Sequence, residues 1–314
     1  KNKNNILVSS LKDNSISKLK KFGAKTKPIK IFSKSTNPIN EIKLLFELKN
    51  LFKSYKPDVV INFTIKPILY SSFLLKNSKI KVINTLDGFG LSLTKNIFFK
   101  KLIFFFFKIS QKNIFKFYAV THKDFKLLQS KKLVPKEKLF LINGTGINLK
   151  HFKYIKPSIN KNTTFVFVGR FLKLKGIILF IKAAILIKKK YPKIKFLAVG
   201  STSKDKYSIS KEELSKWKKI NAVKFLNHVT DIRKILKISD CVVLPTNYPE
   251  GLNRSLLESI STGRPAITNK IGGCDQIIKN NYNGFIKKFK NEFDLANIMI
   301  KYHNLSSYKK KFFS

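Results

Sequence analysis

Short apolar runs alternate with segments of helical length along the whole chain, and this alternation constrains the fold more than any other feature. The runs are rich in aliphatic and aromatic residues, as strands are. Helices are expected over about residues 39–55, 97–116 and 177–191. Strands separated by helices form parallel, doubly wound sheets. We therefore predict an α/β fold with strands at residues 6–9, 28–32, 58–63, 79–84, 117–120, 139–142, 164–168, 196–200, 223–226, 241–245 and 265–268.

The alternating pattern occurs twice, which predicts two domains. A chain of 314 residues is long enough for two domains of ordinary size. Turn-forming and polar residues gather over residues 143–162, where Gly144 and Pro157 mark the joint. We expect a Rossmann-like domain over residues 1–150 and a second one over residues 151–314, facing each other across a cleft.

The formal net charge is +47, from 64 Lys and Arg against 17 Asp and Glu. Nucleic-acid binding is the first interpretation of such a charge. Against it, nearly all the basic residues are Lys rather than Arg, and they are spread along the whole chain instead of forming one block. A bias toward Lys, Asn, Ile and Phe is typical of an AT-rich genome. Because the charge attracts anionic surfaces in any case, we expect a membrane surface as partner and no nucleic acid.

Cysteine and histidine content points away from disulfides and metal sites. The two cysteines, Cys241 and Cys274, lie in apolar or Gly-rich contexts, which predicts no disulfide framework and fits a reducing cytoplasm. The four histidines are scattered singly, and no Cys/His cluster has metal-ligand spacing. We therefore expect neither a bound metal nor a cofactor.

No segment is apolar for long enough to span a bilayer. The longest uninterrupted apolar run in the Phe-rich region covers residues 102–107, whereas a transmembrane helix needs about 20 residues. On a helical wheel of residues 97–116, Lys101, Lys108 and Lys112 share one face and apolar residues occupy another. Two interpretations stay open: a helix that packs on the core and solvates its lysines, or a helix that contacts an anionic membrane.

Two carboxylates, Glu250 and Glu258, flank the segment that most strongly suggests a ligand site. The apolar run before them predicts a buried strand, and the spacing over residues 255–260 predicts a helix. Glu250 is then expected on the loop after the strand, and Glu258 inside the helix. Ligands bind open α/β sheets at such strand ends, where a helix N-terminus offers N–H groups to an anion. This arrangement suits a sugar nucleotide, with hydroxyls on either side and a diphosphate in the middle.

Short motifs along both halves form a recognisable set. In the C-terminal half they are residues 169–170, 175–176, 250–252, 254–258, 263–265, 272–274 and 283–285. In the N-terminal half they are residues 37–38, 63–67, 70, 87–90 and 144–146. Together they resemble the signature of retaining glycosyltransferase family 4, over nearly the whole chain. The resemblance implies the GT-B fold, two Rossmann-like domains in which mainly the C-terminal one holds the nucleotide sugar. The subgroup that the chain most resembles adds single sugars to lipid-linked or capsular glycans.

The resemblance also implies roles for the residues that would hold the donor diphosphate. Arg170 and Lys175, beside Gly169, would bind the diphosphate and neutralise charge on the leaving group. Gly251 and Leu252 would offer backbone N–H groups to the same phosphates, helped by the positive end of the following helix.

The rest of the donor would contact the two carboxylates and their neighbours. Glu258 would accept hydrogen bonds from the ribose hydroxyls, and Glu250 from hydroxyls of the transferred sugar. Val229 lies in a loop expected near the base. Asn253 stands where relatives usually have Pro, and Asn is a good N-cap. The remaining expected donor contacts come from Asn253, Arg254 and Ser255.

The acceptor-side residues implied by the resemblance are Thr64, Lys66 and Asp87. Many relatives carry His where this chain has Asp87, which would contact the donor sugar or the acceptor, or else form a turn. The mechanism is expected to be metal-free, because no Asp-x-Asp pair occurs in the chain. The leaving phosphate would assist deprotonation of the acceptor on the same face. The expected catalytic residues are Glu250, Arg170, Lys175 and Asp87.

The expected activity is transfer of a hexose or N-acetylhexosamine from a nucleotide diphosphate sugar, with UDP as the expected nucleotide. The acceptor would be lipid-linked or a surface polysaccharide, and configuration would be retained. The expected location is peripheral, on the inner face of the cytoplasmic membrane. The chain begins at what resembles the family's second strand, so a second hypothesis is an inactive remnant that binds sugar nucleotides.

Overall fold

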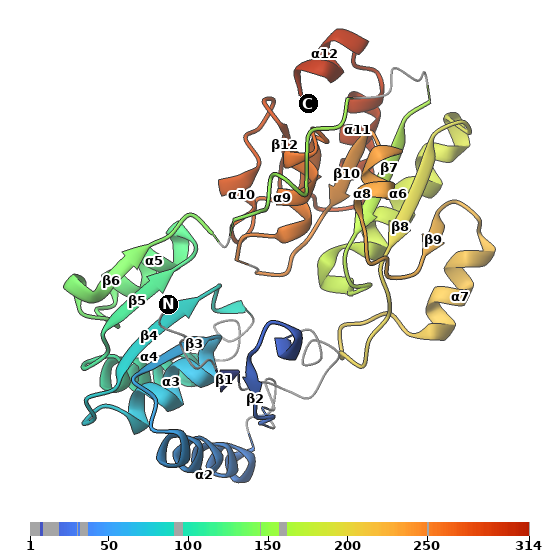
Figure 1. Cartoon of the computed structure of the whole chain (residues 1–314). Helices are drawn as coiled ribbons and strands as arrows, with labels where there is room; N and C mark the ends of the chain where they lie inside the picture. The colour runs from blue at the N-terminus through green and yellow to red at the C-terminus, as the bar shows by residue number, and fades with distance from the viewer. Residues whose placement is uncertain are drawn as a thin grey trace. The chain divides into compact units, whose positions relative to one another are not determined.

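The computed structural model describes residues 7–8, 19–29, 31, 37–90, 97–144, 146–156, 162–249 and 251–313. The chain divides into two compact units (Figure 1). The first comprises Lys1–Leu86, Lys101–Tyr118 and Leu128–Phe140, and the second comprises Asp87–Lys100, Ala119–Leu127 and Leu141–Ser314. The chain therefore passes between the units several times.

A four-stranded sheet in the order β3-β4-β5-β6 organises the N-terminal half. Its strands are β3 (Val59–Phe63), β4 (Lys81–Leu86), β5 (Lys116–Ala119) and β6 (Leu139–Leu141). The helices of this half are α2 (Pro38–Tyr55), α3 (Ile65–Leu74), α4 (Ile97–Ser110) and α5 (His122–Ser130), with a 3-10 turn η2 (Lys136–Lys138). A separate parallel pair joins β1 (Leu7–Val8) to β2 (Lys25–Thr26).

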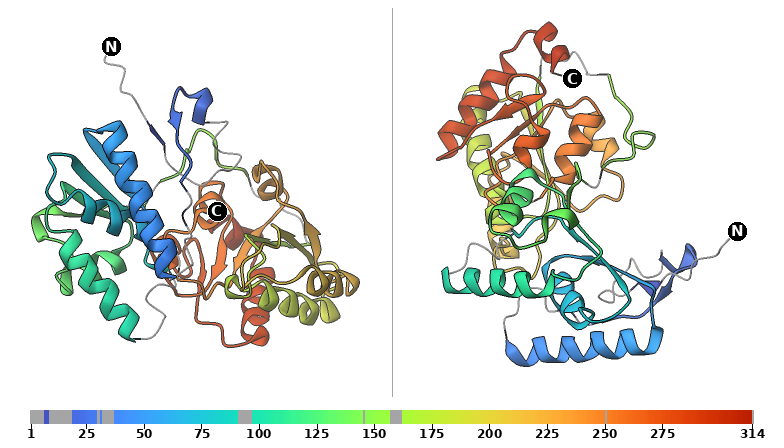
Figure 2. Two further views of the ribbon diagram at one scale, coloured as in Figure 1. Left: turned by 90° about the horizontal axis from the view of Figure 1, so that it is seen from below. Right: turned by 90° about the vertical axis from the view of Figure 1, so that its left-hand side faces the viewer.

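Helix α2 has clear start and stop signals in the sequence. The Asn37 side chain accepts a hydrogen bond from the Ile39 N–H at 3.0 Å, and Pro38 occupies the first helical position. Lys56 ends the helix in the left-handed conformation. Figure 2 shows α2 as one unbroken helix beside the four-stranded sheet. Its buried face carries Leu44 and Leu48.

A six-stranded sheet in the order β12-β11-β10-β7-β8-β9 organises the C-terminal half, and its neighbouring strands pair in parallel. The strands are β7 (Thr164–Val168), β8 (Lys195–Val199), β9 (Lys224–Leu226), β10 (Cys241–Leu244), β11 (Ala266–Thr268) and β12 (Gly284–Ile286). The helices are η3 (Lys173–Lys175), α6 (Ile177–Lys190), α7 (Lys211–Lys219), α8 (Arg233–Lys237), α9 (Arg254–Ser261), α10 (Cys274–Ile277), α11 (Glu292–His303) and α12 (Ser307–Phe312).

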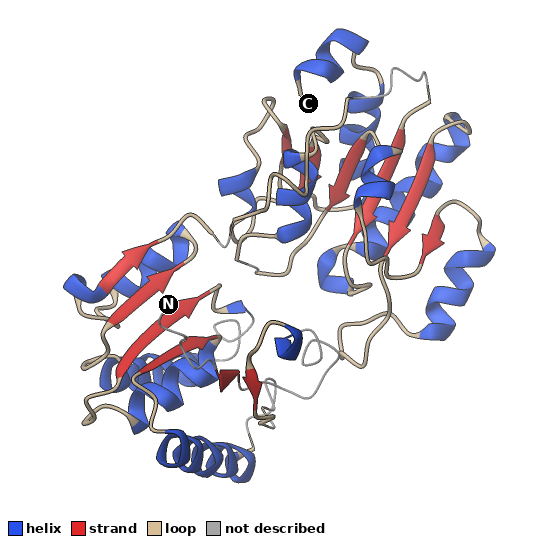
Figure 3. Cartoon of the chain, in the orientation of Figure 1, coloured by secondary structure: helices blue, strands red, loops and turns tan. Residues whose placement is uncertain are grey.

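The central strands of this sheet are buried almost completely. All four residues of β10 are inaccessible to solvent, as are Phe165, Val166 and Phe167 of β7. Figure 3 shows helices on both faces of the sheet, and α6 packs against α11. Strands covered on both faces need apolar residues at every position, which explains the continuous apolar runs. The predicted fold class, two α/β domains with parallel sheets, is confirmed.

One predicted strand is wrong. Residues 28–32 were expected to form a strand, but the strand of this region is β2 at Lys25–Thr26, and Pro28, Ile29 and Ile31 lie outside any strand. Ile29 is nevertheless buried, because it packs with two leucines of α2. The apolar pattern therefore reflects burial against helix α2, and not the pairing of a strand with its neighbours in a sheet.

The Phe-rich helix is also shorter than expected. α4 ends at Ser110 instead of continuing to residue 116. A turn over residues 111–113 follows, in which the Asn113 side chain donates to the Lys76 carbonyl at 2.8 Å. The chain then enters β5 at Lys116. This tertiary contact, which joins residues 37 positions apart, ends the helix earlier than its apolar pattern suggests.

Candidate functional site

The order of the six-stranded sheet reverses between β7 and β10. From β7 the chain adds β8 and β9 on one side, and it then returns to place β10, β11 and β12 on the other. β7 and β10 are neighbours, with Cys241 opposite Phe165. Loops leaving two neighbouring strands in opposite directions open a crevice at the carboxyl ends of the strands, and ligands of open α/β sheets bind in such a crevice.

The start of α6 is pressed against the end of β10 at this point. Gly176 has φ 80°, and a Cβ there would overlap the Pro245 carbonyl oxygen. Both the left-handed backbone and the close approach require glycine. The loop after β7 is therefore held tightly beside the loop after β10.

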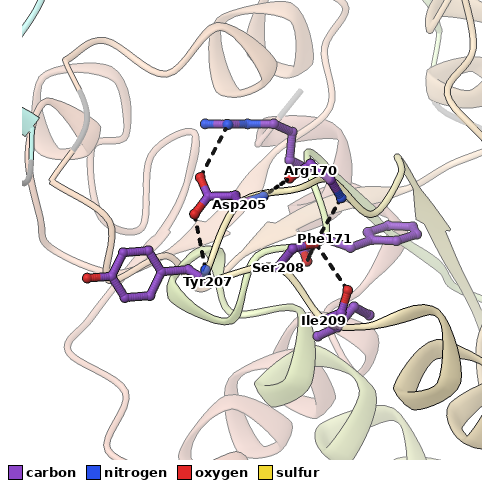
Figure 4. A network of polar contacts seen from close by, with 7 residues as sticks. Arg170, Phe171, Asp205, Tyr207, Ser208 and Ile209 are labelled. Atoms are coloured by element: carbon purple, nitrogen blue, oxygen red, sulfur yellow. Dashed lines mark hydrogen bonds and ion pairs between the residues drawn. The ribbon is translucent and has the colours of Figure 1, made fainter. Parts of the chain in front are cut away.

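The predicted diphosphate ligands follow β7. Gly169 donates its N–H to Val199 at 3.0 Å, and Arg170 comes next. A Cβ on Gly169 would lie 3.5 Å from Cδ and 3.9 Å from Nζ of Lys175, so the Lys175 side chain runs past Gly169. Arg170 is half exposed, and its guanidinium lies 3.9 Å from the Asp205 carboxylate (Figure 4). The structure thus brings the Lys175 side chain beside Gly169, the residue before Arg170.

Glu250 lies outside the described residues, but the residue after it is well placed. A Cβ on Gly251 would overlap the Asp87 carbonyl oxygen, and a Cβ on Gly273 would lie 2.7 Å from the Gly251 carbonyl oxygen. Asp87 and Gly251 belong to the same compact unit. This brings Asp87, an expected acceptor-side residue, beside Gly251, whose N–H group is expected to bind the donor phosphates. The partly buried Leu252 packs against the core of the C-terminal half.

Asn253 caps helix α9, as the sequence predicts. Its Oδ1 accepts the Leu256 N–H at 3.3 Å and the Ser255 hydroxyl at 2.6 Å, and the residue is 4% exposed. Its side chain therefore fixes the first turn of α9. Ser255 was expected to contact the nucleotide sugar, but its hydroxyl donates a hydrogen bond to the Asn253 side chain.

Glu258 has a partner that the sequence analysis did not identify. One turn into α9, its Oε1 accepts a hydrogen bond from Arg254 Nε at 2.8 Å. The Glu258 side chain is 13% exposed and that of Arg254 is 81% exposed. The Glu258 carboxylate is thus nearly buried, whereas the Arg254 guanidinium that donates to it is exposed to solvent.

Val229 is partly buried and packs on the core of the same half. Four residues further on, Arg233 donates to both oxygens of Asp231, at 2.8 and 2.7 Å. These hydrogen bonds lower the pKa of Asp231 to about 2. A third contact, from Arg233 to the His151 carbonyl at 3.2 Å, fastens the loop that follows β9.

The expected acceptor-side residues Thr64 and Lys66 lie at the start of α3. Lys66 Nζ lies 2.6 Å from Glu41, and the Tyr70 hydroxyl donates to the other Glu41 oxygen at 2.6 Å. Burial, reinforced by this hydrogen bond, raises the pKa of the Tyr70 hydroxyl. Thr64 is exposed and has φ 68°, a positive φ that is rare for a β-branched residue. Glu41, on α2, was not identified from the sequence.

The described part of the chain offers neither a metal site nor a membrane-spanning helix. Within it, no group of three or more His, Cys, Asp or Glu side chains lies close enough to hold a metal ion. In the same residues no helix has the length and apolar character needed to cross a membrane.

Comparison with protein families matches both halves of the chain. The family "Glycosyl transferases group 1" matches residues 150–312, and "Glycosyl transferase 4-like" matches residues 1–121. An N,N'-diacetylbacillosaminyl-diphospho-undecaprenol alpha-1,3-N-acetylgalactosaminyltransferase of Campylobacter jejuni is 27% identical over 311 residues, covering 94% of this chain and 80% of that protein. A UDP-Gal:alpha-D-GlcNAc-diphosphoundecaprenol alpha-1,3-galactosyltransferase of Escherichia coli is 27% identical over 286 residues, covering 84% and 70%.

Solved structures share the fold. Anabaena Alr3699/HepE in complex with UDP superposes with a TM-score of 0.77 at 17% identity, covering 98% of this chain and 84% of that one. A glycosyltransferase from Rickettsia africae gives a TM-score of 0.74 at 22% identity, covering 98% and 83%. The fold, the motifs and a family model that matches more than half of the residues all lead to the same assignment. The chain belongs to the glycosyl transferase group 1 family and has the GT-B type of fold that its motifs predicted.

Proposed function

We propose that this protein transfers a hexose or N-acetylhexosamine from a UDP-sugar to a polyprenyl-diphosphate-linked or surface-polysaccharide acceptor, with retention of configuration. One observation carries the donor half of the proposal: the Lys175 side chain runs past Gly169, the residue before Arg170, beside the switch point of the six-stranded sheet. The names of the two relatives support the acceptor class, since both contain a diphospho-undecaprenol group. The UDP-galactose in the second name supports the nucleotide.

In the proposed donor complex, Arg170 and Lys175 bind the diphosphate from the β7 side. Backbone N–H groups of Gly251 and Leu252 bind it from the α9 side, where the helix dipole adds positive potential. Glu258 accepts hydrogen bonds from the ribose hydroxyls. Because Arg254 already occupies Oε1 of this carboxylate, the ribose either shares the carboxylate or displaces the exposed guanidinium.

The remaining donor contacts are proposed at the sugar and the base. Glu250 accepts from hydroxyls of the transferred sugar, and Val229 lies near the base. Asn253 and Ser255 hold the start of α9, where the phosphates bind.

The proposed reaction breaks the bond between the anomeric carbon and the diphosphate oxygen, and the electron pair leaves with UDP. Arg170 and Lys175 stabilise this charge without a metal ion or other cofactor. The acceptor oxygen attacks from the same face and gives its proton to the departing phosphate. Asp87, beside the phosphate loop, contacts the sugar or the acceptor hydroxyl.

Helix α4 is the proposed contact with the membrane that carries the acceptor. Apolar side chains at spacings of four, three and four residues are exposed on it: Phe98, Leu102, Phe105 and Ile109. Phe98 is 72% exposed and Phe105 is 57% exposed. Two exposed lysines of α4, Lys101 and Lys108, follow one side of this stripe, and the exposed Lys112 lies in the turn that ends the helix. An apolar stripe bordered by lysines suits an interface rich in anionic lipid, and we place the protein on the inner face of the cytoplasmic membrane.

The donor assignment is tested by thermal unfolding in the presence of UDP at about ten times its dissociation constant, where binding stabilises the folded state by about 1.4 kcal/mol. A hydrogen bond to a charged group contributes about 1.5–3 kcal/mol, so Arg170→Ala and Glu258→Ala should each remove most of the UDP-dependent rise in melting temperature. Lys182→Ala, which removes a cation of α6 paired with Glu292, should keep it. Full UDP protection in both site variants would refute the assignment.

A further inference from the structure

The backbone that follows Arg170 is fastened to the loop that follows β8. Phe171 donates its N–H to the Ser201 carbonyl and accepts from the Ile209 N–H, both at 3.0 Å. Lys173 donates to the Tyr207 carbonyl at 2.7 Å. Figure 4 shows Phe171, Ser208 and Ile209 within this network. The loop over residues 201–209 therefore forms a platform that fixes the Arg170 backbone.

The side chain facing Arg170 from this platform is Asp205. It is only 6% exposed, its Oδ1 accepts the Tyr207 N–H at 3.1 Å, and its carbonyl accepts the Ser208 N–H at 2.8 Å. Its Oδ2 lies 3.9 Å from Arg170 Nη1 (Figure 4). The Arg170 side chain is 53% exposed. The acid is thus the fixed member of the pair, and the cation is the exposed one.

We propose that Asp205 is a positioning residue, which holds the Arg170 guanidinium at the donor site before the diphosphate arrives. This inference rests on the proposed function, because it needs Arg170 to bind the donor. An exposed arginine loses much side-chain freedom when it binds a ligand. A fixed carboxylate limits that freedom in advance and so reduces what binding must still order. The pair is too long for a tight bidentate bond, which leaves Arg170 able to turn its donors to phosphate.

Asp205 also has an effect that would weaken diphosphate binding instead of favouring it. A carboxylate close to the diphosphate repels it, so removing the charge would strengthen binding if repulsion dominated. The Asp205 charge is partly balanced by Arg170, and the half-exposed guanidinium lies where solvent screens the field. We therefore expect the ordering effect to dominate, and the two effects predict opposite changes in affinity.

The experiment measures the affinity of the full chain for UDP and for uridine, which lacks the diphosphate. Asp205→Ala should weaken UDP binding about two- to tenfold, the range for one side chain that is no longer preordered, and should leave uridine binding unchanged. Asp205→Asn keeps an acceptor for the Tyr207 N–H and should weaken UDP binding less. Glu213→Ala is the matched control, since it removes an acid of α7 that pairs with Lys173 of the same segment at 3.2 Å. This control should bind UDP like the unchanged protein.

The outcomes separate this inference from the proposed function. If Arg170→Ala leaves UDP affinity unchanged, the proposed donor site itself is wrong. If Arg170→Ala weakens UDP binding but Asp205→Ala and Asp205→Asn leave it equal or tighter, only the positioning role is refuted. Equal losses for UDP and uridine would show a merely structural role and would also overturn it. Should Asp205→Ala fail to fold, Asp205→Asn is judged by the same criteria.

Discussion

Asn253 decides which backbone groups at the start of α9 remain for a ligand. Its side chain takes the Leu256 N–H, the third of the helix, and anchors the Ser255 hydroxyl. Phosphate contacts are therefore expected at the residues that precede the helix, Gly251 and Leu252. One amide side chain thus links the stability of the helix to the geometry of the proposed donor site.

Replacing Asn253 with Ala should lower both stability and UDP affinity. Loss of an N-cap costs about 0.5–2 kcal/mol, and urea unfolding measures it. The matched control is Asn291→Ala, because Asn291 caps α11 by accepting the Asp294 N–H at 3.0 Å. Both variants should lose similar stability, but only Asn253→Ala should bind UDP more weakly. Equal UDP affinity in the two variants would contradict the link between the cap and the site.

The sequence predicted residues that act through local patterns and missed those that act across long separations. The Asn253 cap depends on the three residues that follow it, so one segment suffices to predict it. The Glu41–Lys66 pair joins residues 25 positions apart, and the Arg170–Asp205 pair joins residues 35 positions apart. Such pairs depend on how α2 lies against α3, or on the path of a loop, which composition and spacing do not encode.

At the scale of elements, α4 is notable for what it leaves exposed. Its inward face buries Ile103 and Phe107, while Leu102, Phe105 and Ile109 keep more than a third of their surface in solvent. Exposing apolar side chains to water is unfavourable, so a helix that keeps such a face exposed is expected to have another partner. The structure thus gives a physical basis to the second of the two interpretations left open by the sequence.

Replacing three exposed lysines in and just after α4 with Gln should weaken binding to liposomes that contain anionic lipid. Each lysine near such a surface contributes about 1 kcal/mol, so the triple change at Lys101, Lys108 and Lys112 should weaken binding about 100-fold in a sedimentation assay. The control changes three exposed lysines of α7 in the same way: Lys216, Lys218 and Lys219. Equal losses from both triple variants would show that net charge, and not α4, governs the attraction.

Element boundaries show why some strands were predictable and others were not. β7 was expected at residues 164–168 and is found there, because a strand buried on both faces has an unbroken apolar run with clear ends. The run at residues 28–32 is interrupted by Lys30, and its isoleucines pack on α2 outside any strand. An apolar run establishes burial, whereas the choice between strand and loop depends on the neighbours that the fold supplies.

At the scale of the whole molecule, the charge of +47 must be accommodated by the folded state. The folded chain brings like charges closer together than the unfolded chain does, so self-repulsion lowers stability. The described ion pairs offset part of this, but several of them lie at the surface and contribute little.

Added NaCl should therefore raise the melting temperature. Screening changes fastest at low ionic strength, since the Debye length falls from about 30 Å at 0.01 M to about 10 Å at 0.1 M. Most of the rise should thus occur below about 0.1 M, as measured by differential scanning fluorimetry. A melting temperature that falls over this range would mean that favourable ion pairs outweigh the repulsion.

The interleaved composition of the two compact units has a consequence for synthesis on the ribosome. Every segment of the first unit has been made once residue 140 is added, so this unit can fold while the rest is still being translated. Two pieces of the second unit, Asp87–Lys100 and Ala119–Leu127, are made early and must wait for partners from Leu141 onward. Translation speed after residue 140 therefore sets how long these pieces, with the exposed Phe98 at the start of α4, remain open to chaperones.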